Sequence, residues 1–331
     1  MILYVAKRIL GILPVLLGIS FVAFAIIALF PGDFYTLTEV GYVMSGMSRG
    51  DAVAAARALR AAAGMDKPWI VQYWLWFTGI VTKGDFGINW SYVLRPENGL
   101  AWTLIIAGSS MLWGWLLGLP AGILAGTKKN TWIDRVLTGT AYIGFSFPSY
   151  VWGTLFFVFM FTCVNTHIRG PGIWGLVGYE LVGKPLSWYK VGSHILHLIP
   201  AWIIVSAPIY ATVLRHMRSS MAEAMSAPYI TVVRAKGLGE RAIVYKHALR
   251  NAINPLISIF GITLPRMITS MILLAPILGM PTYGQFLLDC VLWNRTRSLF
   301  GGLLIYTGLL LVGNLIADTL LVAIDPRIRY D

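Results

Sequence analysis

Few residues in this sequence have the types and the spacing that enzyme chemistry requires. It contains no HExxH pair for zinc. Its one GxSxG match, Gly46-Met-Ser-Arg-Gly50, lacks the preceding strand that a nucleophilic serine turn requires. His194 and His197 stand three residues apart, but no cysteine or carboxylate beside them completes a metal site. Residues 178–185 resemble a phosphate-binding loop without the Ser or Thr that would hold Mg²⁺. We therefore expect no catalytic residue, no metal site and no cofactor in this chain, so any ATP must be used by a partner.

Three polar residues that interrupt apolar stretches are candidates for a transport pathway. Arg266 falls near the middle of an apolar run, where a cation costs at least about 2.5 kcal/mol in a bilayer. Asn314 and Asp318 are four residues apart and therefore share one face of a helix. Two interpretations stay open for all three: a buried structural group, or a group that borders a water-filled path and meets an anionic or hydroxyl-rich substrate.

A polar island, residues 214–254, interrupts the apolar second half of the chain. It holds seven Lys/Arg and two acids. Residues 229–236 and 240–253 form two short helical patterns, and Gly237 stands between them where a left-handed helix cap is expected. The apolar face of the second helix is expected to hold Tyr245, Leu249, Ala252 and Ile253. By itself such an island is typical of a basic cytoplasmic loop.

Composition places these elements in a membrane. The sequence is 57% hydrophobic and only 12% charged, which excludes an ordinary soluble domain. Its net charge of +12 could suggest a nucleic-acid partner, but the basic residues are dispersed among apolar runs. We expect no nucleic acid and interpret the charge as a signal of membrane orientation. Cys163 and Cys290 have no CxxC spacing and are expected to be packing residues.

Hydropathy predicts an all-α polytopic membrane protein, a single transmembrane domain over residues 1–331 with six transmembrane helices. The expected spans are 9–30, 101–126, 136–163, 194–213, 255–279 and 299–323. Lys and Arg are denser in the segments that would be cytoplasmic if both termini lie inside the cell. Those segments are 1–8, 127–135, 214–254 and 324–331. We therefore expect both termini in the cytoplasm.

Between the first two spans lies an outer loop, residues 31–100, with structure of its own. Residues 51–64 are helix-prone, and residues 69–82 are aromatic and are expected at the membrane interface. Residues 83–87 are expected to form a turn.

Glycine and proline mark the spans themselves. Glycines spaced four apart in the second span predict the close approach of a neighbouring helix. They are Gly114, Gly118, Gly122 and Gly126. Prolines inside later spans predict kinks, because each removes a backbone hydrogen bond. They are Pro120, Pro148, Pro208, Pro265 and Pro276.

Five groups of motifs follow one another along the chain. They are Lys7-Arg8; Gly64-Met-Asp66-Lys-Pro68 with Gly84-Asp85-Phe-Gly87; Asp134-Arg135 with Phe147-Pro148-Ser149-Tyr150; Arg234-Ala-Lys-Gly-Leu with Glu240-Arg and Lys246-His-Ala-Leu-Arg-Asn-Ala; and Asp318 with Asp325-Pro-Arg-Ile-Arg329. In this order and spacing they resemble the dipeptide/oligopeptide/nickel class of ABC-transporter permeases, of the first-permease type. In that class a short cytoplasmic helix at the position of the island lies in a cleft of the ATP-binding subunit.

The resemblance implies a pore-forming subunit of an ATP-driven, binding-protein-dependent importer in a prokaryotic cell membrane. Its partners would be a second homologous permease, two ATP-binding subunits that hold ATP and Mg²⁺, an extracytoplasmic solute-binding protein and membrane lipid. The ATPase-coupling residues that the resemblance implies are Tyr229, Arg234, Ala235, Lys236, Gly237, Leu238, Glu240, Arg241, His247 and Arg250.

The resemblance favours an oligopeptide as substrate, and other substrates stay open. An oligosaccharide is the second choice, because sugar systems recur in this class and 13 tryptophans are available for stacking on sugar rings. A nickel chelate is the third. The alternative of another class, an ion-coupled secondary transporter, predicts an inverted repeat and mid-membrane acids. The sequence shows no such repeat and has only Asp318 as an acid within a span.

Overall fold

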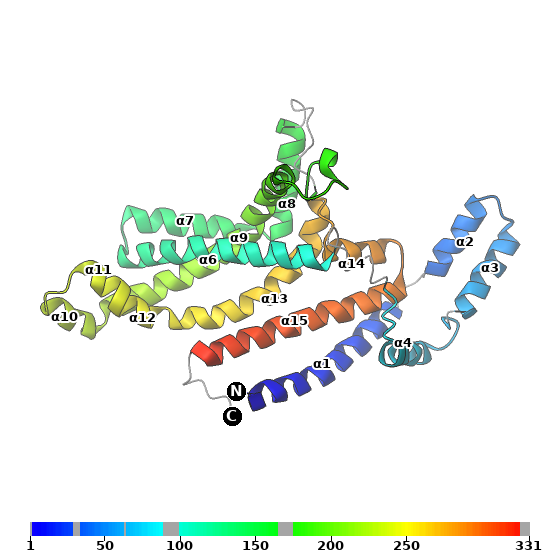
Figure 1. The fold of residues 1–331 in the computed structure, drawn as a ribbon, viewed down its shortest axis with the longest axis horizontal. Coiled ribbons are helices and arrows are strands. Elements are labelled where there is room, and N and C mark those ends of the chain that lie inside the picture. Colours follow the sequence, from blue (N-terminus) through cyan, green and yellow to red (C-terminus); the bar gives the residue numbers. More distant parts are fainter. Residues whose placement is uncertain (1, 29–33, 63, 89–98, 165–174, 325–331) are drawn as a thin grey trace. The chain divides into compact units, whose positions relative to one another are not determined.

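The structure is a computed structural model that describes residues 2–28, 34–62, 64–88, 99–164 and 175–324 (Figure 1). Every regular element in this described part is a helix, which confirms the all-α prediction. The α-helices are α1 Ile2–Ala28, α2 Phe34–Met44, α3 Arg49–Ala62, α4 Trp69–Lys83, α6 Leu100–Thr127, α7 Trp132–Ser146, α8 Ser149–Phe159, α9 Trp188–Ser226, α10 Pro228–Ala235, α11 Glu240–Ala242, α12 Leu249–Ala252, α13 Asn254–Ile277, α14 Tyr283–Leu292 and α15 Thr296–Ile324. Short π-helices, η1 Met160–Val164 and η3 Ile243–Ala248, and a 3₁₀ turn, η2 Tyr179–Leu181, accompany them.

The helices form two compact units. The first unit holds residues 1–99 and 283–312, and the second holds residues 100–282 and 313–331. The expectation of a single domain stays a prediction.

An aromatic cluster joins α1, α4 and α15 within the first unit. The ring of Phe24 in α1 stacks on Phe300 in α15 with ring centroids 4.0 Å apart, and Tyr73 and Trp76 of α4 close the cluster. Tyr73 and Trp76 are three residues apart and therefore share one face of α4. On the other side of the helix Trp74 is 56% exposed, whereas Trp76 is 6% exposed. The aromatic stretch 69–82 thus packs one face against the cluster and leaves the other face exposed.

Two further parts of this unit correspond to sequence predictions. The predicted helix 51–64 is present as α3, which packs on α2. The helix α2 was not predicted from the sequence. The predicted turn at 83–87 is present and is tied to the start of α15. Arg297 donates from Nη2 to Asp85 Oδ2 at 2.6 Å, and the Ser298 hydroxyl donates to the Gly87 carbonyl at 2.6 Å.

The second unit is built on α6 and α9. A Cβ added to Gly122 would lie 2.5 Å from Cβ of Met217 and 2.8 Å from the carbonyl oxygen of Leu214, so only glycine fits there. Gly114, Gly118 and Gly126 meet successive turns of α9 in the same way. The predicted close approach of a neighbouring helix is therefore present, and α9 is that neighbour.

The third predicted span, 136–163, is a broken helix pair. α7 and α8 are bent by 91° at the break between them. Phe147 is extended, with φ −135° and ψ 149°, because Pro148 disfavours the α conformation of the residue before it. By contrast, α6 and α9 continue through Pro120 and Pro208.

By length and composition α6, α9 and α15 can each cross a membrane, and the α7–α8 pair is a fourth candidate if it forms one span. Within the described side chains, α1 and α13 contain shorter apolar stretches, Leu10–Ile26 and Arg266–Ile277. All six predicted spans therefore coincide with helices, although only three or four satisfy the full length and composition criterion.

Helix α9 is longer than a span requires. At 1.5 Å per residue its 39 residues extend for about 58 Å, whereas the hydrocarbon core of a bilayer is about 30 Å thick. The helix does not end near residue 213, where the span was predicted to end, but continues to Ser226 and leads directly into α10.

Candidate functional site

The predicted coupling segment caps one end of the second unit (Figure 1). After α9 ends, α10 follows at once, and the chain returns through α11, η3 and α12 to α13. Pro228 occupies the first turn of α10, where its missing N–H is tolerated. Ile230 is 1% exposed and anchors α10, which contacts α9 and η3. One face of this short helix is thus held, and the others are open.

The turn after α10 requires Gly237. Its φ is +79°, in the left-handed region, and its N–H donates to the carbonyl of Arg234 at 3.0 Å. No atom lies within 4 Å of the position that a Cβ would occupy, so the backbone conformation and not the space demands glycine. The left-handed cap predicted from the sequence is present.

An ion pair spans this turn. Arg234 donates from Nε to Oε1 of Glu240 at 2.8 Å and from Nη2 to Oε2 at 3.3 Å. These hydrogen bonds lower the pKa of the Glu240 carboxyl below its ordinary value and raise that of Arg234. The two side chains are 52% and 64% exposed, so water screens their attraction. The pair fixes the shape of the turn more than it stabilises the fold.

The second helical stretch, residues 240–253, is not the single α-helix that was predicted. The π-helix η3 interrupts it, and a π-helix bonds residue i to i+5, which changes the face that each side chain occupies. Ile243, Ala248 and Ala252 form the buried face, whereas Tyr245 is 63% exposed. The prediction that Tyr245 belongs to the apolar face is therefore wrong.

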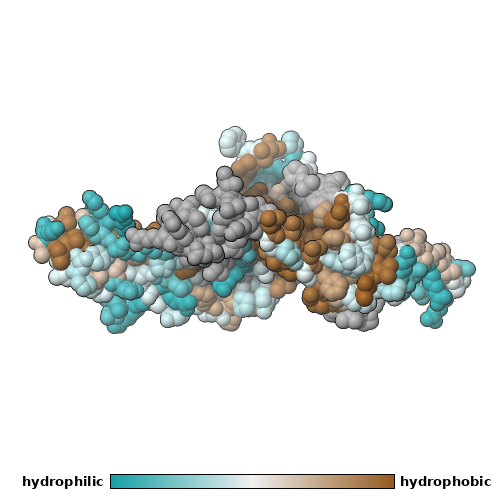
Figure 2. Space-filling view, turned by 90° about the horizontal axis from the view of Figure 1, so that it is seen from below, coloured by the Kyte–Doolittle hydropathy of each residue, from teal (hydrophilic) through white to brown (hydrophobic). Residues whose placement is uncertain are grey.

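The predicted coupling residues are contiguous and mostly accessible. The Tyr229 hydroxyl accepts a hydrogen bond from the Asn251 amide at 3.2 Å, which links α10 to α12, and His247 is half-buried. The exposed members are Arg234, Ala235, Lys236, Gly237, Leu238, Glu240, Arg241 and Arg250. Figure 2 shows hydrophilic and hydrophobic residues mixed over this end, in agreement with exposed Val232 (57%) and Leu238 (41%) among the charges.

An ion pair at the same end of the unit was not predicted. Arg218 of α9 donates from Nη2 to Oδ2 of Asp134 in α7 at 2.8 Å, and its Nε donates to the other carboxylate oxygen. The backbone N–H of Asn130 and the Thr138 hydroxyl also donate to this carboxylate. Asp134 is 3% exposed, so the pair ties α7 to α9 beneath the surface. The partners are 84 residues apart, which no local spacing rule could connect.

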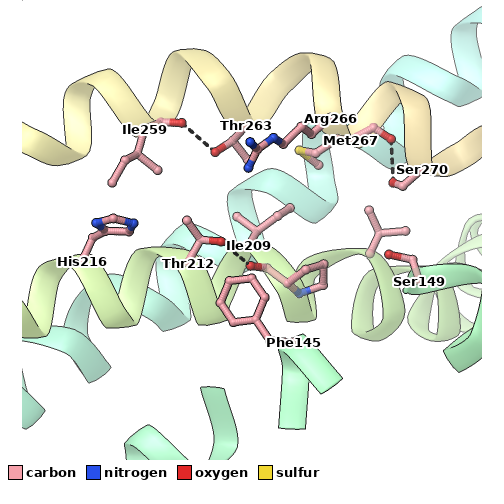
Figure 3. Close-up of a pocket in the computed structure, with 12 residues that line it drawn as sticks. Phe145, Ser149, Ile209, Thr212, His216, Ile259, Thr263, Arg266, Met267 and Ser270 are labelled. Atoms are coloured by element: carbon pink, nitrogen blue, oxygen red, sulfur yellow. Dashed lines mark hydrogen bonds between the residues drawn. The ribbon is translucent and has the colours of Figure 1, made fainter. Parts of the chain in front are cut away.

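Arg266 lies in a cavity of about 470 Å³ between α7, α8, α9 and α13 (Figure 3). The lining residues are Phe145, Ser149, Val205, Pro208, Ile209, Thr212, His216, Ile259, Thr263, Arg266, Met267 and Ser270. Thr212, Thr263 and Ser270 each donate to a carbonyl of their own helix, at 2.7, 2.7 and 2.8 Å. A hydroxyl that donates in this way still has lone pairs that can accept from a ligand.

The cavity lining carries the positive charge of Arg266. The described lining includes the basic side chains of Arg266 and His216 and no acid. The Arg266 side chain is exposed, and within the part of the chain that the structure describes no hydrogen bond or ion pair engages its guanidinium. This geometry favours the pathway interpretation of Arg266 over a structural one. Asn314 and Asp318, on α15, are not among the lining residues, so their pathway role stays a separate prediction.

One ring nitrogen of each of the two neighbouring histidines of α9 lies against a backbone carbonyl. Nδ1 of His194 lies 2.6 Å from the Leu176 carbonyl, and Nδ1 of His197 lies 2.7 Å from the Ser193 carbonyl. Hydrogen bonds of this kind orient a ring without any metal.

Comparisons with known proteins extend over the whole chain. The family model described as "Binding-protein-dependent transport system inner membrane component" matches residues 118–330, and a model for the N-terminal part of such components matches residues 1–95. The oligopeptide transport system permease protein AppB of Bacillus subtilis is 30% identical over 99% of this chain and 99% of its own. The dipeptide transport system permease protein DppB of Escherichia coli is 28% identical over 100% and 99%. The glutathione transport system permease protein GsiC of Salmonella choleraesuis is 30% identical over 99% of each chain.

Proposed function

Since the chain belongs to the family of binding-protein-dependent transport system inner membrane components, we propose that it forms, with a second homologous permease, the pathway of an importer for oligopeptides. As a family member it is a multi-pass membrane protein and a permease subunit, and the ATP hydrolysis that drives such systems belongs to partner ATPases. We further propose two ATP-binding subunits that hold ATP and Mg²⁺, an extracytoplasmic binding protein, no cofactor in this chain and both termini in the cytoplasm.

The end-to-end similarity to three peptide permeases carries the substrate proposal. AppB, DppB and GsiC are named for oligopeptides, dipeptides and glutathione, all of which contain peptide bonds. The cavity supports the same choice. None of its described lining residues is a tryptophan, so the 13 tryptophans of the sequence do not supply there the stacking surface that an oligosaccharide would use.

The coupling segment supplies the link to ATP. We place α10 in the cleft of an ATPase subunit, because it is short, anchored by buried Ile230 and open on its other faces. The continuous helix α9 joins α10 to the wall of the cavity that Thr212 and His216 line. A movement of α10 would therefore be transmitted along a rigid element to the pathway.

Co-purification and uptake together test the proposal. The tagged chain, expressed with the genes beside its own, should recover ATPase subunits. Proteoliposomes that contain this complex and its binding protein should accumulate labelled oligopeptides only with ATP inside. Recovery of no ATPase would refute the permease proposal, and ATP-dependent uptake of oligosaccharides without peptides would refute the substrate alone.

A further inference from the structure

The cavity around Arg266 has the chemistry of a carboxylate site, and we propose that Arg266 binds the C-terminal carboxylate of a peptide during its passage. This inference rests on the proposed peptide-import function. It names the chemical group of the substrate that the pathway itself recognises, as distinct from recognition by the binding protein.

The charge of Arg266 requires an anion or water. A cation within a membrane span is costly, and arginine stays protonated in proteins. Three acids in the described part of the chain pair with arginines, but no acid is among the described lining residues of the Arg266 cavity. The pairs are Asp134–Arg218, Glu240–Arg234 and Asp85–Arg297. The guanidinium is exposed to a cavity of about 470 Å³, within the size range of small-molecule sites. A passing ligand can therefore supply the missing negative charge.

The groups beside Arg266 fit the end of a peptide. Figure 3 shows Thr263 and Ser270 on the same side of α13 as Arg266, at three residues before it and four after it. A planar guanidinium can donate two parallel hydrogen bonds to a carboxylate. The hydroxyls of Thr263 and Ser270 already donate to their own helix, so toward a ligand they act as acceptors, which suits peptide N–H groups.

The apolar part of the cavity lining tolerates variation in the peptide side chains. Phe145, Ile209 and Met267 present apolar surface to the cavity. Apolar contact is non-directional, and methionine adapts its shape to different neighbours. Every linear peptide has one C-terminal carboxylate whatever its sequence. A carboxylate site with apolar walls therefore gives recognition of peptides as a class. A neutral oligosaccharide offers hydroxyl acceptors but no negative charge to pair with the guanidinium.

The experiment compares peptides that differ only in this group. The complete importer is reconstituted in proteoliposomes with its binding protein, and uptake is measured for one peptide as the free acid and as the C-terminal amide. The measured quantity is the acid-to-amide ratio of uptake rates, for the unchanged protein and for Arg266→Gln. The unchanged permease and the Arg266→Gln variant receive substrate from the same binding protein. Any preference of the binding protein for the acid or the amide therefore cancels when the two ratios are compared.

We expect Arg266→Gln to lower the acid-to-amide ratio by about tenfold, which corresponds to the loss of a charge-assisted hydrogen bond. Arg266→Lys, which keeps the charge without the planar fork, should give an intermediate ratio and also serves if Arg266→Gln does not assemble. Arg250→Gln removes an arginine from the coupling segment and should leave the ratio unchanged, whatever it does to the rates.

The outcomes separate the two proposals. An equal loss of acid and amide uptake in Arg266→Gln, or no change in either, overturns carboxylate binding while peptide import stands. Absence of ATP-dependent peptide uptake by the unchanged complex overturns the import function, and with it the inference.

Discussion

At the scale of single residues, the strictest structural requirement in the coupling segment is the left-handed backbone conformation of Gly237. Gly237 has φ +79° and Gly239 has φ −64°, and for both residues the space where a Cβ would stand is empty. The two glycines therefore differ in conformation and not in crowding. One substitution with alanine at each position isolates that difference.

Gly237→Ala should weaken coupling between ATP hydrolysis and transport, whereas Gly239→Ala should leave it nearly intact. A left-handed alanine costs about 1 kcal/mol, enough to lower the population of the turn about fivefold. The measurement is the amount of peptide taken up per ATP hydrolysed in proteoliposomes. Equal values for the two variants would show that the left-handed turn is irrelevant to coupling.

The Arg234–Glu240 pair makes a second prediction at this scale. Glu240→Arg places two like charges across the turn and should reduce coupling with the spans still inserted, because the two-point hydrogen bond is lost. The double variant Arg234→Glu with Glu240→Arg restores opposite charges. Recovery of uptake per ATP in the double variant would assign the effect to the turn, and no recovery would assign it to contacts with a partner.

At the scale of elements, the contact between α6 and α9 depends on the absence of side chains. Gly122→Ala would bring a methyl group to 2.5 Å from Met217 Cβ, so the helices must separate. Overpacking of this kind costs about 1–3 kcal/mol. Gly108 belongs to the same helix and has no atom within 4 Å of its Cβ position. The melting temperature of the purified complex should fall for Gly122→Ala and not for Gly108→Ala; equal temperatures would contradict this packing.

The link between α7 and α9 gives another prediction. Asp134→Asn leaves the partly buried guanidinium of Arg218 without its counter-charge. Removal of one partner from a buried pair costs about 3–5 kcal/mol, and the partial exposure of Arg218, 28%, places the expectation at the lower end. Thermal unfolding measures the loss. Asp134→Asn with Arg218→Met should recover part of it, because no unpaired charge remains; a double variant less stable than the single one would contradict the role of the pair.

Sequence patterns predicted the elements better than their junctions. The runs of apolar residues located the helices of the expected spans, although the third span is the broken pair α7–α8. The glycine spacing located the close contact of α6. Both signals lie within one segment of the sequence. The π-helix over 243–248, the continuation of α9 to Ser226 and the Asp134–Arg218 pair were missed. These features depend on packing between distant segments, which a local pattern does not contain.

Of the residues in the candidate site, likewise, some were predicted from the sequence and others were not. Gly237 was located because a left-handed cap has a local signature, and Arg266 because a cation in an apolar run is unusual. Other lining residues of the cavity, such as Phe145 and Ile209, are common apolar types that come together only when α7, α8, α9 and α13 meet. Tyr245 was assigned to the wrong face because the π-helix shifts the register after Ile243.

At the scale of the whole molecule, the orientation in the membrane decides whether the coupling segment can reach the ATPase subunits. We predict a cytoplasmic position for the coupling segment from the density of Lys and Arg in segments 1–8, 127–135, 214–254 and 324–331. We predict an outer position for α2 from the single span expected before it. Both placements can be measured with single cysteines, because Met44 on α2 is 83% exposed and Leu238 beside Gly237 is 41% exposed.

In a background with Cys163→Ala and Cys290→Ala, a membrane-impermeant maleimide should label Met44→Cys in intact spheroplasts. It should label Leu238→Cys only after permeabilisation, because the basic segment stays on the cytoplasmic side. If α10 lies in the cleft of an ATPase, labelling of Leu238→Cys should also fall when the ATPase subunits are co-expressed, whereas that of Met44→Cys should not change. Labelling of Leu238→Cys in intact spheroplasts would invert the topology. Equal labelling of Leu238→Cys with and without the ATPases would leave the predicted topology intact but contradict the docking of α10. A residue next to a docked helix cannot stay fully accessible to a reagent.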